Sequence, residues 1–244
     1  FPLSTTLDSI GPLAASVGCC ALLDQVMARK EISPLIARPV SMLTLGVPQT
    51  IVLDGLDTTV AATFEAVLSK LSAAGAQILD IPFDALEEIP KANATGGFAA
   101  CEAFAILRDL LEARQDRFDP RVSLRVKRGA EMSAADYHDL IRARISIRAR
   151  ADAQTRGFDA LLMPTVPIVA PVLAELVASD EAYHETNMLM LRNCSFGNFL
   201  DRCAVSLPVH EMGSAPVGLM VMGETLGDTK TLEVAAGIEA VFSE

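Results

Sequence analysis

Three residues near the end of the chain have the side chains of a hydrolytic triad: Asp201, Ser206 and His210. In such a triad a histidine activates the serine hydroxyl and an aspartate orients the histidine. Here, however, Ser206 lies inside an apolar segment, CAVSLPV, and no G-x-S-x-G turn presents its hydroxyl. We therefore predict that no set of residues in this chain is catalytic by itself.

The histidines and cysteines do not have the spacing of metal ligands. His138, His184 and His210 are isolated from one another, and the five cysteines form no C-x-x-C pair. Glycine-rich phosphate-binding loops of the P-loop or dinucleotide type are also absent from the sequence. We expect no metal and no cofactor, and we expect the cysteines to be free, buried thiols in a reducing compartment.

The charge of the chain argues against nucleic-acid binding. Twenty basic and 31 acidic residues give a net charge of −11, which repels a phosphate backbone. The basic residues between Arg108 and Arg156 recur at helical spacing, as on a solvated helix face. No apolar run approaches the roughly 20 residues that span a bilayer, and no targeting signal is found, so we expect a cytoplasmic protein without membrane contact.

The first third of the sequence alternates between helical and strand patterns. A helix is predicted from Leu13 to about Met27, and a buried strand from Val40 to Val47. A helix opened by Asp57 or Thr58 follows, ends at Gly75 and leads into a strand over 76–83. A strand, a helix and a second strand in this order predict a right-handed crossover between parallel strands.

The remainder is helical first and then strand-rich. Helices are expected over 86–156 with breaks near 93–97 and 119–120. Ser133 and Asp136 form a capping box that opens a long helix at Ala134. Strands are predicted before Pro164, over 203–209 and over 217–223, and Asp228 opens a last helix to about Phe242. The chain is therefore predicted to be a single α/β domain, or most of one.

Four segments resemble, in the same order, successive segments of the amidase signature family. They are FPLSTTLDSIGPLAASV, FDALLMPTVPIVAP, LRNCSFGNFLDRCAVSLP and SAPVGLMVMG. The family includes amidases, allophanate hydrolase and the A subunit of glutamyl-tRNA amidotransferase. The resemblance implies an α/β fold with a mixed sheet covered by helices on both faces. It assigns structural roles to Asp8, as a helix cap, and to Gly11-Pro12, as a helix entry.

The resemblance also implies that part of the catalytic apparatus is missing. Family members use a serine nucleophile, a second serine and a lysine, and both serines lie in a Gly/Ser-rich segment ahead of the one that Phe1 opens here. No such segment occurs in this sequence. We therefore expect residues 1–244 to be the C-terminal part of an amidase-like domain whose catalytic N-terminal part is absent.

The resemblance points to four substrate-binding residues: Arg128, Thr165, Asn193 and Asn198. Arg128 matches an arginine that holds a substrate carboxylate in the tRNA amidotransferase subunit, where a guanidinium can make two parallel hydrogen bonds. A solvated arginine at a helix end is the alternative for Arg128, and a backbone-tying role in a loop is the alternative for Asn198. Leu191 replaces the acidic residue that binds glutamine in that subunit.

These matches imply the substrate-pocket half of an amide hydrolase that converts a carboxamide to a carboxylate through a serine acyl-enzyme. The expected partners are a small amide substrate and the N-terminal half, on the same or a separate chain. Association with further copies of the chain as a homo-oligomer is left open. Two alternatives remain at this point: a catalytically inactive amidase-like binding or regulatory subunit, and the A subunit of a glutamyl-tRNA amidotransferase.

Overall fold

Five short strands form one mixed sheet in the order β2-β1-β3-β5-β4. A computed structural model describes residues 2–242. The strands are β1 (Thr44–Pro48), β2 (Gln77–Ile81), β3 (Ala160–Pro164), β4 (Ala204–Pro208) and β5 (Gly218–Met222). Strand β1 pairs in parallel with β2 and β3, whereas β5 is antiparallel to both β3 and β4. The expected mixed sheet and the parallel crossover are confirmed.

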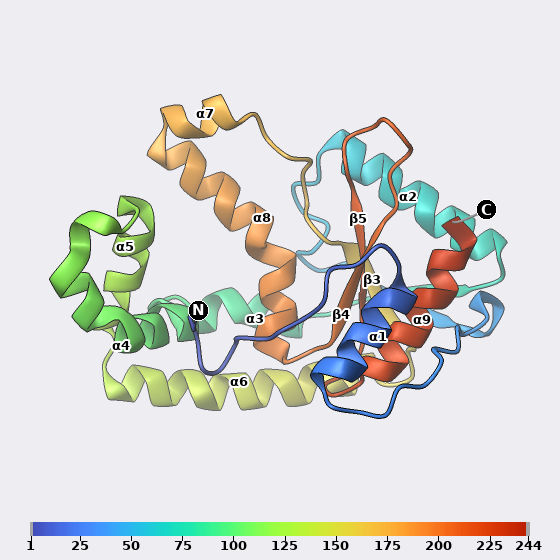
Figure 1. The fold of residues 1–244 in the computed structure, drawn as a ribbon, viewed down its shortest axis with the longest axis horizontal. Helices are drawn as coiled ribbons and strands as arrows, with labels where there is room; N and C mark the ends of the chain where they lie inside the picture. The colour runs from blue at the N-terminus through green and yellow to red at the C-terminus, as the bar shows by residue number, and fades with distance from the viewer. Residues whose placement is uncertain (1, 243–244) are drawn as a thin grey trace.

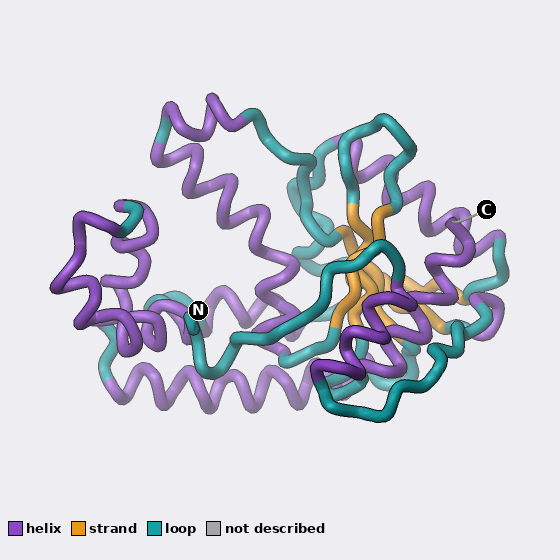
Figure 2. Tube along the Cα trace, viewed as in Figure 1, coloured by secondary structure: helices purple, strands orange, loops and turns teal. Residues whose placement is uncertain are grey.

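Helices cover both faces of this sheet (Figures 1 and 2). The helices of the described chain, including some that stand away from the sheet, are α1 (Val17–Met27), α2 (Thr58–Ala73), α3 (Ala85–Ala92), α4 (Gly97–Arg114), α5 (Pro120–Lys127), α6 (Ala134–Thr155), α7 (Leu173–Ala178), α8 (Asp180–Leu200) and α9 (Asp228–Phe242). Short 3₁₀ turns are η1 (Val40–Met42), η2 (Gln115–Arg117) and η3 (Arg128–Glu131). None of the helices among residues 2–242 is both long enough and apolar enough to cross a membrane.

Alternating side chains of the inner strands enter two separate cores. In β3, Ala160 and Leu162 belong to the core under α1, α2 and α9. Leu161 and Met163 belong to the opposite core, under α3, α6 and α8. All five residues of β3 are buried, as the period of two in a sheet covered on both faces requires.

Several helix boundaries follow directly from local capping. Ser133 and Asp136 make the predicted capping box, and Asp57 caps α2 by accepting a hydrogen bond from the backbone N–H of Val60. Two elements begin four residues later than predicted. Helix α1 begins at Val17 because Ser16 caps it, and the predicted first strand begins only at Thr44, after the turn η1.

The N-terminal segment and the cysteines also differ from expectation. Asp8 accepts a hydrogen bond from the backbone N–H of Leu3 and does not cap the first helix. Leu13, expected inside that helix, is 99% exposed. The cysteines are free, as predicted, but Cys19 is exposed and the other four are only half-buried, so the expectation that they are buried is wrong.

Helices α4 and α5 with η3 form a helical lobe that stands away from the sheet (Figure 1, left). The lobe has a small core of its own around Leu107, Leu111 and Val126. Gly129 allows η3 to approach α4 closely, because a Cβ at this position would lie 2.1 Å from the carbonyl oxygen of Ala100. The Arg-Gly step at 128–129 therefore has a packing reason.

Strand β4 is an edge strand with one open face. Val205 and Leu207 pack into the core under α9, whereas Ala204, Ser206 and Pro208 are exposed. The backbone N–H of Val209 donates to Val217, and that of Gly223 donates to Cys203. With antiparallel alternation, the N–H groups of Ala204 and Ser206 then point away from β5, toward the open edge.

Glu102 joins the N-terminal segment to α4 and α6. This residue is 8% exposed, and its carboxylate accepts hydrogen bonds from the hydroxyls of Ser4, Thr6 and Tyr137 and from the backbone N–H of Thr6. Burial alone would raise the pKa of Glu102, but these hydrogen bonds outweigh it and hold the pKa below its ordinary value.

Glu102→Gln should therefore destabilise the chain by about 1.5–3 kcal/mol at pH 7, because the donors lose a charged acceptor. Since the folded pKa is depressed, this stability is complete above the unfolded pKa of about 4.3 and is lost as the pH falls through the folded value. Urea unfolding measured from pH 7 down to pH 3 should show that the difference in the free energy of unfolding between wild type and variant becomes smaller. Glu112→Gln, at an exposed position of the same helix, is the control. A difference that stays constant over this range would contradict the assignment.

Candidate functional site

The candidate site lies where the parallel strands β1 and β3 end side by side. The chain leaves β1 through α2 to reach β2 on one side, and β3 pairs with β1 on the other side. Such a change of direction at the carboxyl ends of parallel strands is where open α/β sheets bind ligands. Thr165, predicted as a site residue, is the first residue after β3 and is half-buried at this edge.

The side chain of Thr165 meets that of Ser206 across strand β5. Their hydroxyl oxygens, Oγ1 of Thr165 and Oγ of Ser206, are 2.6 Å apart, and the backbone N–H of Thr165 donates to the carbonyl of Gly218 at 2.8 Å. Ser206 is exposed on the open face of β4. The structure thus joins Thr165, a predicted site residue, to Ser206, which the sequence suggested only as a member of the rejected triad with Asp201 and His210.

Asn193 lies directly beneath this edge. It is fully buried, and its Nδ2 donates to the carbonyl oxygens of Pro164 at 2.8 Å and Val52 at 3.1 Å. Arg192 donates to the same Val52 oxygen at 3.0 Å and to Oδ1 of Asn193 at 3.1 Å. In this chain the amide of Asn193 therefore holds the ends of the β1 loop and of β3 in place.

The loop after β1 carries backbone strain that the sequence did not reveal. Ile51 has a φ of +60°, a left-handed conformation that is unfavourable for a β-branched residue. The hydrogen bonds to Val52 from α8 hold the loop in this form, and Thr50 Oγ1 accepts from the backbone N–H of Phe83. Strain of this kind concentrates at functional sites, which supports this edge as the candidate site.

Asp57 fixes the loop that follows Thr165. Its backbone N–H donates to the carbonyl of Pro167 at 3.1 Å, and its Oδ2 accepts from the backbone N–H of Val169 at 2.6 Å. The same carboxylate caps α2 through Oδ1. One residue therefore couples the start of α2 to the loop after β3.

The other two predicted site residues lie elsewhere. Arg128 is exposed at the junction of α5 and η3, in the helical lobe. Asn198 is exposed on the last turns of α8, so it lies in a helix and not in the expected loop. Asn198 contributes its carbonyl oxygen, which accepts from Arg144 at 3.3 Å. The structure thus brings Thr165 and Asn193 together at the end of β3 and leaves Arg128 and Asn198 outside that group.

The unfavoured triad does not assemble. Asp201 precedes β4 and pairs with Arg148 at 2.9 Å, whereas His210 follows β4. Five strand residues, about 16 Å in length, separate these two ends. Nδ1 of His210 is buried and has no hydrogen-bond partner among residues 2–242. Asp201, Ser206 and His210 therefore do not form a triad in this structure.

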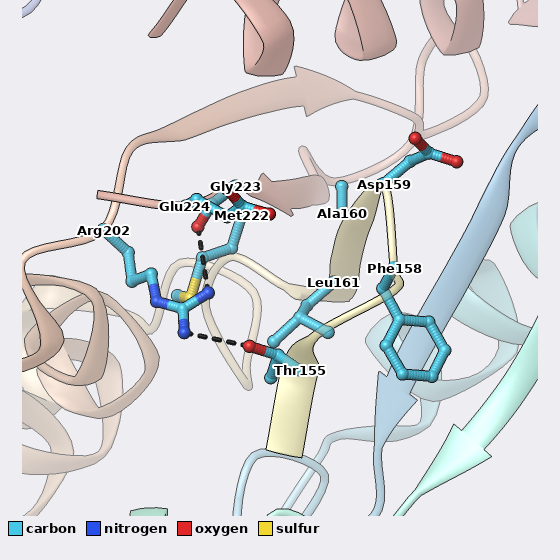
Figure 3. A pocket seen from close by; sticks show the side chains of 9 residues that line it. All are labelled: Thr155, Phe158, Asp159, Ala160, Leu161, Arg202, Met222, Gly223 and Glu224. Atoms are coloured by element: carbon cyan, nitrogen blue, oxygen red, sulfur yellow. Dashed lines mark hydrogen bonds between the residues drawn. The ribbon is translucent and has the colours of Figure 1, made fainter. Parts of the chain in front are cut away.

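A small cavity of about 10 Å³ lies beside Arg202, at the opposite end of the strands, where β3 begins and β5 ends (Figure 3). The side chain of Arg202 is 2% exposed and donates to Thr155 at 2.9 Å and to Asp152 at 2.7 Å. Burial lowers the pKa of this guanidinium. The cavity has room for about one water molecule, so it is too small for a substrate.

Side-chain clusters that could hold a metal ion are absent from the part of the chain that the structure describes. The edge at Thr165 instead offers neutral donors and acceptors, namely two hydroxyls and the backbone of two fixed loops. Such a surface can orient a polar, uncharged group of a ligand, but it provides no activated nucleophile.

Asn193→Ala should lower the free energy of unfolding by about 2–3 kcal/mol, because it leaves two buried carbonyl groups with fewer donors. Asn198→Ala, on the exposed side of the same helix, should change it by no more than about 0.5 kcal/mol. Denaturant unfolding of both variants measures the contrast. Equal effects would show that Asn193 does not brace the ends of β1 and β3.

Comparison with known proteins agrees with the arrangement of this sheet and these loops. A 2-amino-5-chloromuconic acid deaminase of Comamonas testosteroni is 33% identical over all of this chain and 53% of its own length. The A subunit of a glutamyl-tRNA(Gln) amidotransferase from Halobacterium salinarum is 27% identical over 97% of this chain and 63% of its own length. A crystal structure of an amidase superposes with a TM-score of 0.83 at 26% identity, covering 99% of this chain and 54% of that protein.

The chain thus spans between half and two thirds of the length of these relatives. The family model described as amidase matches residues 1–232. The chain belongs to the amidase family.

Proposed function

We propose that this chain is the substrate-facing C-terminal half of an amide hydrolase whose catalytic residues lie in an N-terminal half. The observation that carries the proposal is the chemistry at the end of β3. Ser206 hydrogen-bonds to Thr165 and not to a base. The site therefore has polar groups that can position a ligand but no activated nucleophile. The relatives are about twice as long as this chain, which leaves room for the catalytic residues in a second half.

The complete enzyme would use a serine supplied by the other half. Its hydroxyl oxygen attacks the carboxamide carbon, the amide nitrogen leaves as ammonia or an amine after taking up a proton, and water then hydrolyses the ester to the carboxylate. The backbone donors that stabilise the oxyanion also belong to the other half. This chain would supply one wall of the acyl pocket through the loops after β1 and β3.

Exposed apolar surface supports a covering partner. Five apolar residues in α1 and in the segments before and after it are each more than half exposed, namely Ile10, Leu13, Val26, Ile32 and Ile36. The open edge of β4 adds unpaired backbone groups. Apolar patches and free strand edges of this kind mark interaction surfaces. We assign them to contact with the N-terminal half, whether this half lies on the same chain or on a separate one.

The name of one relative supports a substrate that carries a carboxylate in addition to its amide. The relative at 33% identity is named for a deamination of 2-amino-5-chloromuconic acid, whose name denotes an acid. Among the expected site residues, Arg128 is the cation that could receive a carboxylate. Its side chain is exposed in this chain, so the N-terminal half would have to cover it in the complete enzyme.

The second candidate is the A subunit of a glutamyl-tRNA amidotransferase, because a relative of that name covers 97% of this chain. Two features weigh against it. Leu191, at the position of the glutamine-binding acidic residue, is exposed on α8, and the chain carries a net charge of −11. If the N-terminal half lacks the catalytic residues, the third reading applies, a catalytically inactive binding or regulatory subunit.

The isolated chain should not hydrolyse a simple amide such as benzamide, because no serine hydroxyl among residues 2–242 is hydrogen-bonded to a histidine or a lysine. Ammonia release by the purified chain, compared with the same chain mixed with the N-terminal half of a relative, measures this. Turnover by the isolated chain that disappears in Ser206→Ala would contradict the proposal.

In the complete enzyme, Arg128→Ala should lower kcat/KM for amides with a second carboxylate by roughly 30-fold, since a charge-assisted bond in a covered site is lost. Neutral amides of the same size should change little, and Arg128→Lys should restore part of the loss. Arg125→Ala, an exposed change on the same helix, is the matched control. Equal losses for acidic and neutral amides would show that Arg128 is structural.

A further inference from the structure

Thr165 and Ser206 form a hydroxyl pair that strand order alone would keep apart. Strand β5 lies between β3 and β4, so their axes are two strand spacings, about 10 Å, from each other. The pair exists because Gly218 of β5 has no side chain. A Cβ there would lie 2.7 Å from the Ser206 oxygen and 2.8 Å from the Thr165 oxygen. Gly218 thus provides the space in which the two hydroxyls meet.

The hydroxyl pair has hydrogen-bonding capacity to spare. Two hydroxyls carry two O–H donors and four acceptor lone pairs, and their mutual bond uses one of each. Within residues 2–242 neither hydroxyl makes a second hydrogen bond. One donor and three acceptor positions therefore stay available at an edge where Ser206 is exposed and Thr165 half-buried.

The surroundings hold the pair rigidly. Thr165 is fixed through its own N–H to Gly218, and the preceding carbonyl, that of Pro164, is held by the buried amide of Asn193. Ser206 lies in the paired strand β4. Groups fixed in this way lose little freedom when a ligand binds, so their hydrogen bonds contribute more of their strength to affinity.

We propose that Ser206 and Thr165 together bind the carboxamide group of the substrate, with one hydroxyl donating to its carbonyl oxygen and the pair accepting from its amide nitrogen. This inference rests on the proposed function and adds a residue and a ligand chemistry to it. A carboxamide matches the pair because it both donates and accepts. The carboxylate product only accepts and is negatively charged, so the pair discriminates the substrate from the acid.

Benzamide and benzoate test this in the complete protein, this chain together with its N-terminal half, because they differ only in the group that the pair should recognise. Titration calorimetry gives the dissociation constant of each without requiring turnover. Ser206→Ala and Thr165→Val should each weaken benzamide binding about 3- to 10-fold, and the double variant little more than either alone. Benzoate binding should change less than about 2-fold.

Two further variants separate recognition from folding. Ser214→Ala, an exposed serine whose hydroxyl donates to the carbonyl of Glu211, should leave benzamide binding unchanged. Gly218→Ala should weaken it as much as the double variant, because its Cβ displaces both hydroxyls. An unchanged dissociation constant in Ser206→Ala would overturn the inference, as would a lowered Tm with equal weakening of both ligands, or wild-type protein that does not bind benzamide.

The inference and the proposed function can fail separately. Benzamide binding that depends on Ser206 in a protein that never releases ammonia would sustain the inference and remove the hydrolase. Ammonia release by wild-type protein with binding that is indifferent to Ser206 would do the reverse.

Discussion

The burial of strand β3 on both faces is the constraint on which the rest of the molecule depends. Its side chains enter both cores, and β1 and β5 pair with its two edges. A strand so enclosed has no freedom to shift its register, because a slip by one residue would exchange the two cores. Thr165 directly follows this strand and is therefore held in a fixed position. The candidate site is therefore precise because it extends the most buried element of the sheet.

Much of the fold could be predicted because its signals are local. Ser133 with Asp136, and Asp57 ahead of Val60, are separated by three residues and determine helix starts whatever surrounds them. The apolar strand segments were recognisable by their length and composition, and the mixed sheet followed from the family resemblance. The errors were at ends, such as α1, where a serine closer to the helix replaced the expected cap.

The site was less predictable because its contacts are not local. Thr165 and Ser206 are 41 positions apart, and the glycine that lets them meet lies on a third strand, so no spacing in the sequence reveals the pair. Side chains of α8 hold the loop at Ile51 in a left-handed conformation. Isoleucine disfavours this conformation, so the residue type gives no sign of it in the sequence. The motif positions of Arg128 and Asn198 did not reveal their surroundings: Arg128 lies in the helical lobe, and Asn198 is exposed on α8, the helix whose buried Asn193 reaches the site.

In the proposed complete enzyme, this chain presents an open sheet edge to a second half of an amidase. Hydrogen exchange at the backbone amides of Ala204 and Ser206 tests this most directly, since these N–H groups point away from β5. Exchange should be fast in the isolated chain and slowed by roughly a hundredfold or more in the complete protein, while Leu207 changes far less. Equal exchange of Ala204 and Ser206 in both would show that no strand or loop of the second half covers this edge, and would contradict the account.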